Sequence, residues 1–545
     1  MSLTHRSPGV PDRRSRLRRT WPLAALALAV GVGLGSAGLS ACSGSSAHPA
    51  AGDTPAGTAS AAASPSPGLS DTAAENAKPG TNAWSIPASA IGPQNAIQGY
   101  TDQASVTPGQ SFKLFVSTTA PSFTATAYRI GYYGGANGRE VWQSPSTPGK
   151  HQTAQTIAPG THTVECNWSP SMTVPTQSWP PGDYLIKLVA SNGTGQRYVP
   201  ITVRSTDTTG KIILVAGVTT WQAYNAWGGY SLYHGPSGGP SDRARAVSFD
   251  RPYLDPDEEA ADGLFFPFDQ ALVSFAEQHN LPVAYETDVE LETEPAQFTH
   301  AAGIVSDGHD EYYSATMRQT LTAARDAGAN LAFLGANAIF RHIRWGSTQL
   351  GADRLIICYK DAASDPMYAT DKTQTTQDWR DEPDPRPENT LTGAYYQCNP
   401  VDAPYVVYDP TNWIFAGTGA TKGEKFPGLV GPEYDRVVDI ATTPHPIEVL
   451  SHSALTCDGH ASYQESAYYT TSSGAGVFDA GTMRWECALG SQCSSHLNAA
   501  DRAFVRTATL NLLTAFGQGP VGKAHPANDN TAADGVPHSG GLGID

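Results

Sequence analysis

Alternating hydrophobic and polar positions characterise the first part of the folded chain, from Ile91 to Arg204. The clearest alternating runs are 111–117, 184–190 and 198–204, and Pro-Gly or Asn-Gly turn pairs lie between such runs. Short alternating strands separated by turn residues are typical of antiparallel sheets. The pattern therefore predicts a small β-sandwich of immunoglobulin-like type. The segment 91–204 contains no cluster of titratable residues, which favours a structural role for this predicted sandwich.

The pattern changes at Lys211, where the apolar run 212–216 becomes continuous. A continuous run suits a strand that is buried on both faces of a sheet. Strands and helices then alternate, which predicts a parallel sheet covered on both sides. The expected elements are a helix near 268–279, strands at 282–285, 302–306 and 330–334, a helix from Ser314 to Gly328, a strand–turn–strand near 466–478 and a helix near 498–516.

The N-terminal segment has the features of an export signal. Five arginines between residues 13 and 19 precede the apolar run 21–39, which ends in Leu39-Ser40-Ala41-Cys42. That ending resembles the lipobox of bacterial lipoproteins, so residues 1–42 are interpreted as a signal peptide with Cys42 as the lipidation site. We expect an exported protein that is lipid-anchored at the outer face of the cell membrane. A plain cleaved signal or a transmembrane anchor is the alternative, and the export route, Sec or Tat, stays open.

Composition divides the rest of the chain. Residues 43–84 are rich in Ala, Gly, Ser, Pro and Thr and predict a disordered linker, and residues 517–545 predict a disordered tail. Between them we expect the β-sandwich domain at 85–207 and the α/β domain at 208–516.

Charge and cysteine content limit the possible partners and chemistry. Residues 1–41 hold six Arg and one Asp, so their removal lowers the net charge from −17 by 5 to −22. Such an acidic protein is not expected to bind nucleic acid, and its membrane contact should be the lipid alone. Six cysteines besides Cys42 suggest three disulfides, with Cys487–Cys493 and Cys358–Cys398 as the favoured pairs among fifteen possible pairings.

Polar and aromatic residues follow several of the predicted parallel strands, at the edge of the sheet where ligands bind. These segments are 219–229, 307–313 and 335–337. His309 and Glu311 lie in a turn ahead of a helix N-terminus and can point to one place, where the helix dipole favours an ionised carboxylate that suits a metal. The alternative is that the acidic residues only cap the helix and that His309 is a hydrogen-bonded loop histidine.

Several common hydrolytic sites are excluded by the sequence. It contains no His-Glu-x-x-His zinc motif, no phosphate-binding Gly-x-x-x-x-Gly-Lys-Ser/Thr motif and no Cys-x-x-Cys. Residues 235–239 match the Gly-x-Ser-x-Gly pattern by letter only, since they lie in a Gly/Pro-rich loop without the required strand and helix. A metal-activated water is the route to hydrolysis that remains.

The chain resembles the large (beta) subunit of N,N-dimethylformamidase and its exported relatives over roughly residues 85–515. The segments that carry the resemblance are 128–135 (YRIGYYGG), 223–233 (AYNAWGGYSLY), 247–253 (VSFDRPY), 307–314 (DGHDEYYS), 333–338 (FLGANA) and 473–481 (SGAGVFDAG).

The resemblance implies a glutamine-amidotransferase-like α/β domain and a mononuclear non-haem Fe(III) site. The implied iron ligands are Tyr224, Tyr253 and Glu311, with Tyr230 and Tyr233 as rivals for the tyrosine positions. The implied catalytic residues are His309, as a proton shuttle, and Asn337, which would orient the substrate carbonyl. Hard anionic oxygen donors of this kind suit Fe(III).

We therefore expect a metal-dependent hydrolase of C–N bonds in linear amides, with a metal-bound water as nucleophile and a small-molecule amide as substrate. Two features depart from the family. Glu465, at the place of a later acidic residue, lies in uncertain register, and the small helical subunit of the family enzyme is not contained in this chain. The alternatives are a different divalent metal at the same residues, or a surface-binding lipoprotein for carbohydrate or a protein partner that keeps the fold without catalysis. The substrate and oligomeric state stay open.

Overall fold

The computed structural model describes residues 71–193, 195–254, 261–491, 493 and 495–532. The predicted signal peptide, the lipidation site Cys42 and residues 533–545 lie outside these ranges. The described residues form one structural unit. Within the described residues, no helix combines the length and hydrophobicity that a membrane span requires.

Two sheets that share one hydrophobic core form the sandwich. Buried Phe112 and Leu114 of one sheet and Ile186 and Leu188 of the other belong to a single cluster, which confirms a sandwich; its immunoglobulin-like type stays a prediction. One sheet has the order β1 (Ile97–Thr101), β3 (Ser111–Thr118), β9 (Met172–Pro175). The other has the order β2 (Ser105–Val106), β11 (Gln196–Val203), β10 (Gly182–Ala190), β4 (Ser122–Ile130), β5 (Gly138–Gln143), with β6 (Thr147–Pro148) paired to β4.

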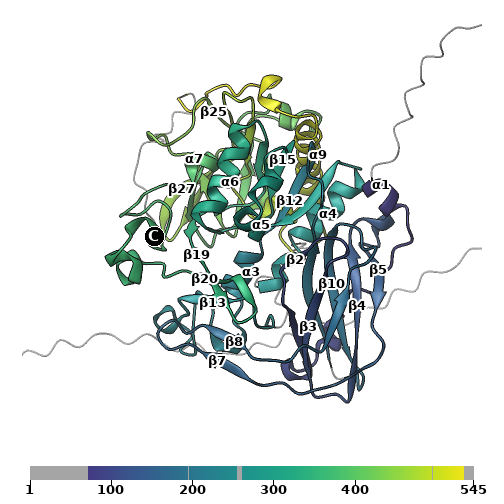
Figure 1. Ribbon diagram of the computed structural model, residues 1–545. Helices are drawn as coiled ribbons and strands as arrows, with labels where there is room; N and C mark the ends of the chain where they lie inside the picture. Colours follow the sequence, from purple (N-terminus) through teal and green to yellow (C-terminus); the bar gives the residue numbers. More distant parts are fainter. Residues whose placement is uncertain (1–70, 194, 255–260, 492, 494, 533–545) are drawn as a thin grey trace, which may run out of the picture. The chain divides into compact units, whose positions relative to one another are not determined.

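The α/β part is built on a seven-stranded sheet (Figure 1). The first five strands of its order run parallel, β28 is antiparallel to β29, and β25 is antiparallel to β28. The mixed α/β class predicted for this region is thereby confirmed. The strand order is β14 (Val283–Thr287), β12 (Ile212–Ala216), β15 (Gly303–Ser306), β17 (Asn330–Phe333), β29 (Gly476–Asp479), β28 (Ala467–Thr470), β25 (Ile447–Val449).

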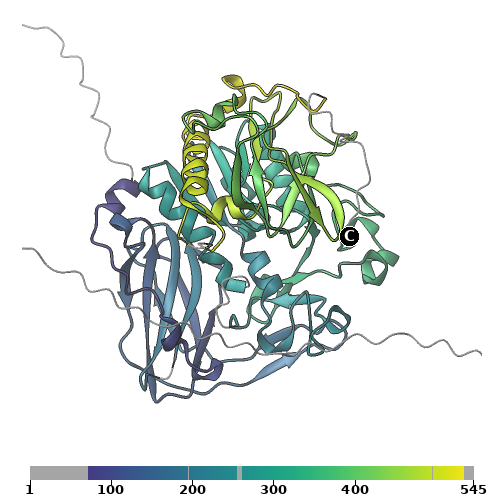
Figure 2. The same cartoon turned by 180° about the vertical axis from the view of Figure 1, so that it is seen from behind.

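Helices cover both sides of this sheet. Helix α6 lies on the side seen in Figure 1, and α9 lies on the side seen in Figure 2. Ser314 caps α6, since its hydroxyl accepts a hydrogen bond from the Met317 amide at 3.1 Å. The helices are α1 (Asp71–Asn76), α2 (Ala88–Ile91), α3 (Val218–Tyr224), α4 (Asp269–Gln278), α5 (Asp288–Thr293), α6 (Ala315–Asp326), α7 (Asn389–Thr392), α8 (Arg484–Cys487) and α9 (Ala499–Phe516).

Short strands outside the large sheet form small antiparallel sheets and one parallel pair. The parallel pair is β16 (Tyr312–Tyr313) with β18 (Arg341–His342), directly beside the expected site. The antiparallel sheets are β13 (Ala246–Ser248) with β20 (Gly351–Ile357) and β19 (Arg344–Thr348), β21 (Tyr395–Cys398) with β24 (Tyr434–Arg436), β22 (Ala403–Val406) with β23 (Lys425–Val430), β26 (Ser453–Cys457) with β27 (His460–Gln464), and β7 (Gln155–Ile157) with β8 (Val164–Cys166).

Two segments expected to be disordered are partly ordered. In the linker expected at 43–84, α1 buries Glu75, which accepts hydrogen bonds from Tyr133 at 2.8 Å and Arg139 at 2.6 Å. In the tail expected at 517–545, the Val521 amide donates to Asn330 Oδ1 at 3.0 Å. Polar hydrogen bonds hold these segments, and a low apolar content does not reveal such contacts.

The disulfides differ from the expected set. Cys487–Cys493 forms as predicted, but Cys398 is bonded to Cys457, so the predicted Cys358–Cys398 pair is wrong. Cys358 is buried after the end of β20, whereas Cys398 ends β21, a strand of another sheet. Cys358 and Cys166 are free thiols, which leaves two of the three expected disulfides in the described residues.

A buried ion pair joins the sandwich to the α/β part. Arg129 of β4 donates to Glu277 of α4 at 2.6 Å, and both side chains are at most 2% exposed. The same carboxylate accepts from the Tyr132 amide at 3.0 Å and from the Tyr285 hydroxyl at 2.6 Å. A Cβ at Gly131 would lie 2.1 Å from Glu277 Oε2, so a larger residue here would displace the ion-paired carboxylate. The 128–135 motif therefore serves to dock the sandwich.

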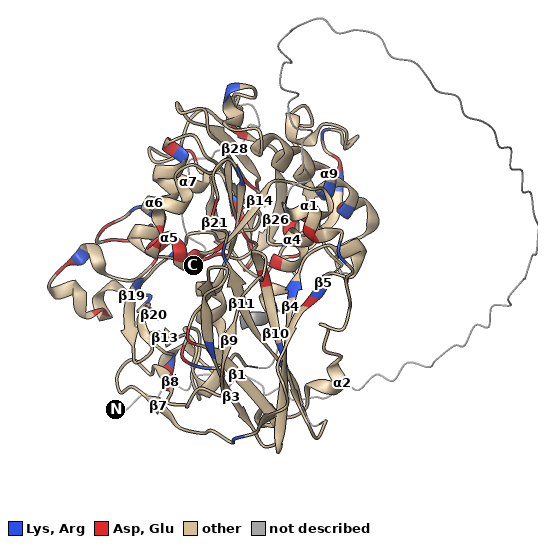
Figure 3. Cartoon of the chain, turned by 45° about the vertical axis from the view of Figure 1, so that its right-hand side comes forward, with Lys and Arg blue, Asp and Glu red and all other residues tan. Residues whose placement is uncertain are grey.

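Charged side chains occur over both parts of the molecule. In Figure 3, blue and red segments are interspersed along the ribbon of the sandwich and of the α/β part.

Replacing Arg129 with Met should lower the free energy of unfolding by about 3–5 kcal/mol, because it leaves the Glu277 carboxylate buried without its cation. Urea unfolding followed by tryptophan fluorescence measures this. The matched control is Asp326→Asn, which removes an ion pair with Arg325 at a 57% exposed side chain and should cost less than about 1 kcal/mol. Equal losses in the two variants would contradict the assigned role of the junction.

Proteolytic digestion without reduction should release Cys398 linked to Cys457 and Cys487 linked to Cys493. Iodoacetamide added under denaturing, non-reducing conditions should label Cys166 and Cys358, because both thiols are free. Mass spectrometry of the peptides reads out both results. A peptide that links Cys358 to Cys398 would show the structural pairing to be incorrect.

Candidate functional site

The carboxyl ends of four neighbouring strands meet at one edge of the large sheet. Thr220 lies in α3, which follows β12, and Glu311 lies in the loop that follows β15. The Thr220 hydroxyl accepts a hydrogen bond from the Glu311 amide at 2.9 Å. A Cβ at Gly335 would lie 1.6 Å from Gly308 O, so the loops after β15 and β17 touch. The Thr482 amide, after β29, donates to Gly335 O at 2.9 Å. The strand-end segments therefore converge, as parallel sheets require of a site at this edge.

Glu311 lies at the centre of this edge and is 1% exposed. Tyr233 donates to Glu311 Oε2 at 2.6 Å, and the Tyr224 hydroxyl lies 3.5 Å from the same oxygen. Arg341 Nε donates to Oε1 at 3.2 Å, and His309 Nε2 lies 3.6 Å from Oε2. The two phenols and the carboxylate thus place three oxygen atoms side by side.

Glu311 is ionised in spite of its burial. Burial alone would raise the pKa of this carboxyl, but the positive charges of Lys360 and Arg341 and the nearby His309 outweigh it. The net result is a pKa below the ordinary value for glutamic acid. Arg341 also forms an ion pair with Asp378, which fixes the guanidinium between two carboxylates.

The phenol of Tyr233 is surrounded by polar and charged groups and stays protonated against Glu311. Tyr312 donates a hydrogen bond to the Tyr233 oxygen at 2.7 Å, and Lys360 Nζ lies 3.3 Å from the centre of its ring. Burial, followed by the charge of Glu311, raises the pKa of both Tyr224 and Tyr233 well above 10. Burial and the neighbouring Arg341 lower the pKa of Lys360 to about 7.

His309, Asn337 and a third residue, Glu433, form a polar group beside the phenols. His309 Nε2 lies 3.1 Å from the Tyr224 hydroxyl, and its Nδ1 is buried without a hydrogen-bond partner. Glu433 Oε1 accepts a hydrogen bond from Asn399 Nδ2 at 3.0 Å and lies beside the Asn337 side chain, while Asn337 Oδ1 and Glu433 Oε2 are buried without partners. Burial raises the pKa of Glu433 above its ordinary value, although His309 opposes this.

A cavity of about 460 Å³ opens onto Tyr224, His309 and Glu433. Its size is in the range of small-molecule binding pockets, which span roughly 300–1,000 Å³. The remaining lining residues are Leu264, Pro267, Phe268, Pro432, Met483, Arg484, Cys487, Cys493, Ser495 and His496.

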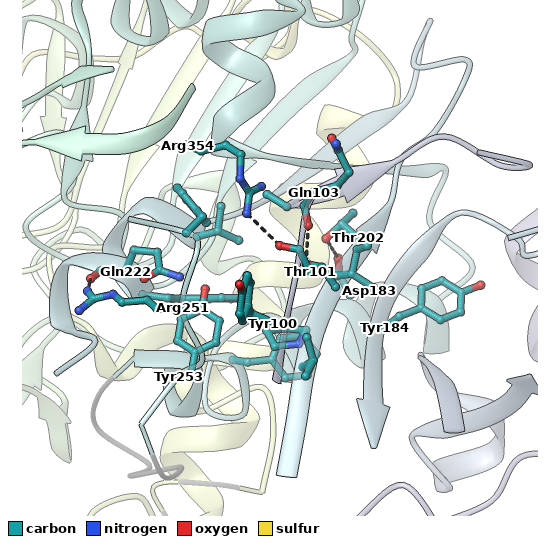
Figure 4. A pocket seen from close by; sticks show the side chains of 18 residues that line it. Tyr100, Thr101, Gln103, Asp183, Tyr184, Thr202, Gln222, Arg251, Tyr253 and Arg354 are labelled. Atoms are coloured by element: carbon teal, nitrogen blue, oxygen red, sulfur yellow. Dashed lines mark hydrogen bonds between the residues drawn. The ribbon is translucent and has the colours of Figure 1, made fainter. Parts of the chain in front are cut away.

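Tyr253 lies in a different place from the one expected for an iron ligand. On α3, Thr220 and Tyr224 are one helical turn apart and face Glu311, whereas Val218, Trp221 and Gln222 lie on other sides of the helix. Those three residues and Tyr253 line a second cavity, together with Tyr100, Arg251 and Arg354 (Figure 4). The backbone at 252–254 is tied to Asn225 by hydrogen bonds, which holds Tyr253 beside that cavity.

The two rival tyrosines separate in the same way. Tyr233 contacts Glu311 directly. The centre of the Tyr230 ring instead lies 5.0 Å from the centre of the His162 ring, between β7 and β8. The structure therefore brings together Tyr224, Tyr233, His309 and Glu311, with Asn337 joined through Glu433.

Sequence reasoning missed Arg341, Lys360 and Glu433. The expected later acid, Glu465, instead accepts from the Val437 amide at 3.0 Å and lies 2.7 Å from His452 Nδ1. Glu433 precedes β24 in a loop-rich region without a strand pattern that could have placed it at the site. Arg341 lies three residues after the 333–338 motif, and its closeness to Asn337 in sequence was the only available signal.

The donor set at Glu311 fits a hard metal ion. It offers one ionised carboxylate and two phenols whose rings lie 4.3 Å apart, and Arg341 and Lys360 can offset the charge of phenolates. Cys398, Cys457 and Asp458 also lie close together, but their sulfur atoms are joined in a disulfide, which makes them poor ligands.

Comparisons with curated proteins and with solved structures carry no conclusion about this site. A search of curated proteins gave no match. Among solved structures, a cycloisomaltooligosaccharide glucanotransferase from Paenibacillus sp., complexed with cycloisomaltoheptaose, is similar at 11% sequence identity, with 35% of this chain and 27% of that chain covered. Its TM-score of 0.14 is too low to support any conclusion about fold or function.

The family comparison is broader. The profile of the family described as "N,N-dimethylformamidase beta subunit-like, C-terminal" matches residues 124–497, from β4 of the sandwich to beyond α8. This match spans more than half of the chain and includes every residue of the Glu311 site. The chain therefore belongs to the N,N-dimethylformamidase beta subunit-like family.

Proposed function

We propose that this protein is a metal-dependent hydrolase of C–N bonds in linear amides, with Fe(III) held by Tyr224, Tyr233 and Glu311. The observation that carries the proposal is the group of three adjacent oxygen donors around Glu311 Oε2, beside a cavity of about 460 Å³. Membership of a family named for an amide hydrolase supports the same reaction class. The site differs from the sequence hypothesis in one ligand, Tyr233 in place of Tyr253.

The metal and the protein would have separate tasks. When bound, Fe(III) supplies Lewis acidity, which polarises an amide carbonyl and makes water a better nucleophile near neutral pH. Arg341 and Lys360 keep Glu311 ionised and stabilise negative charge on the phenols. Tyr312 adds a hydrogen bond to the Tyr233 oxygen, which further favours its anion.

Proton transfer falls to His309 and Glu433. His309 lines the cavity, and its buried Nδ1 has no partner, so the ring can take a proton from water and return it to the leaving amine. Glu433 is a second proton donor, because burial raises the pKa of its carboxyl. Asn337 lies against Glu433, and its side-chain amide can orient the substrate carbonyl.

The setting of the enzyme is part of the proposal. We place it outside the cytoplasm, anchored through a lipid on Cys42 and tethered by the low-complexity residues that follow. The two disulfides are compatible with an oxidising compartment. Its binding partner would be a small-molecule amide and not a nucleic acid. The protein would contact the membrane only through the lipid. The small helical subunit of the family enzyme is not encoded in this chain.

Glu311→Gln should lose at least nine-tenths of the bound iron, because it removes the anionic ligand while keeping the side-chain shape. Elemental analysis of protein purified from iron-replete cells measures the metal, and the visible tyrosinate-to-iron absorption should disappear in parallel. Thermal unfolding checks that the variant stays folded. Wild-type protein that is colourless and free of iron would contradict the proposal and favour the surface-binding alternative.

Tyr233→Phe and Tyr253→Phe form a matched pair, since each removes one phenolic oxygen. The first should weaken iron binding at least tenfold and shift or abolish the visible band, because Tyr233 contacts Glu311. The second should keep iron content and spectrum unchanged, because Tyr253 lines the other cavity. The reverse result would restore Tyr253 as the ligand and overturn the assignment of Tyr233.

A further inference from the structure

The cavity beside the Glu311 site is much larger than the smallest amides. Its volume is about 460 Å³. With roughly 30 Å³ for each water-sized group, as in liquid water, a cavity of this volume accommodates about 15 such groups. An amide with five non-hydrogen atoms, such as dimethylformamide, would fill about a third of it on the same scale. Most of the cavity would then remain filled with water.

Most of the lining residues beyond the polar end are apolar. Tyr224, His309 and Glu433 form the polar end, where the reaction is proposed to occur. The apolar wall consists of Leu264, Pro267, Phe268, Pro432, Met483 and the Cys487–Cys493 disulfide. Such a wall favours an apolar group over water, because the transfer of apolar surface from water is favourable by about 25 cal/mol per Å².

Phe268 is fixed in this wall by close packing. Gly308, with φ +52°, lies so close to Phe268 that an added Cβ would be 2.3 Å from the ring. This glycine belongs to the segment that carries His309 and Glu311. The apolar wall and the reactive end are therefore held together by direct contact rather than by a mobile loop.

The positive charge of Arg484 in the cavity lining is balanced by the carboxylate of Asp402. Arg484 Nη1 donates to Asp402 Oδ1 at 2.6 Å and to Gly428 O at 2.8 Å. His496 Nδ1 lies 3.8 Å from the same aspartate. Because Asp402 balances this end of the cavity, the lining does not favour a negatively charged substrate.

We infer that the natural substrate class is a neutral linear amide that carries an apolar group of about aromatic size, which would occupy the wall formed by Leu264, Phe268 and Met483. This inference rests on the proposed amide hydrolysis. It goes further by assigning the cavity to the substituent of the amide and by making the smallest formamides poor substrates.

Matched acetamides test the inference with the iron-loaded wild-type protein. N-benzylacetamide should have a kcat/KM roughly 10- to 100-fold above that of N-methylacetamide, because only its ring fills the apolar wall. 4-(Acetamidomethyl)benzoate, which adds a carboxylate to the same ring, should be poorer than N-benzylacetamide. Equal or higher kcat/KM for N-methylacetamide would overturn the inference while leaving amide hydrolysis in place.

Met483→Phe and Met483→Leu show whether the wall is responsible. The phenyl ring adds bulk inside the cavity, whereas Leu roughly keeps the volume. The ratio of kcat/KM for N-benzylacetamide to that for N-methylacetamide should fall at least tenfold in Met483→Phe and stay within threefold of wild type in Met483→Leu. An unchanged ratio in a folded Met483→Phe protein would contradict the assigned location.

A binding measurement separates this inference from the proposed reaction. 4-Phenylbutan-2-one replaces the NH of N-benzylacetamide with CH2 and cannot be hydrolysed. Calorimetry with wild-type protein should show it binding at least tenfold more tightly than butan-2-one, and Met483→Phe should remove this difference. If no amide is hydrolysed, the proposed function fails, and the ketone pair still tests the cavity. Equal binding of the two ketones would overturn the inference.

Discussion

A negative charge buried at Glu311 is the constraint around which the site is built. A carboxylate that is 1% exposed requires nearby positive charge and hydrogen-bond donors to remain ionised. Arg341, Lys360 and the Tyr233 phenol supply them, and they come from β18, the segment after β20 and the loop after α3. Interactions with the Glu311 carboxylate thus hold together segments that are far apart in sequence. The negative charge of Glu311, which these segments surround, also makes the site suitable for a hard cation.

Much of the framework could be predicted from local patterns. Strand alternation in 111–117 and the continuous apolar run 212–216 depend only on neighbouring residues, and both became strands. The rule that ligands bind beyond the carboxyl ends of parallel strands then placed Tyr224, His309 and Glu311 at one edge, where the structure has them in contact. These predictions succeeded because strand direction and sheet order constrain the positions of loops.

The remaining features depend on side-chain direction and long-range packing. Tyr233 and Tyr253 both follow α3 in sequence, and the paths of the loops that carry them decide which one reaches Glu311. Glu433 arrives from a region of short strands whose arrangement has no periodic signal. Cys398 pairs with Cys457 because the end of β21 meets the β26–β27 hairpin, a tertiary contact that cysteine spacing does not contain. Local sequence patterns do not contain this information.

The Cys487–Cys493 bond has a consequence for when the protein matures. It belongs to the lining of the large cavity, so one side of that cavity is closed by a covalent link. Such links persist in oxidising compartments and are rare in a reducing cytosol. The binding chamber would therefore take its final form only under oxidising conditions, and a reduced chain would have a cavity whose lining is not yet covalently closed.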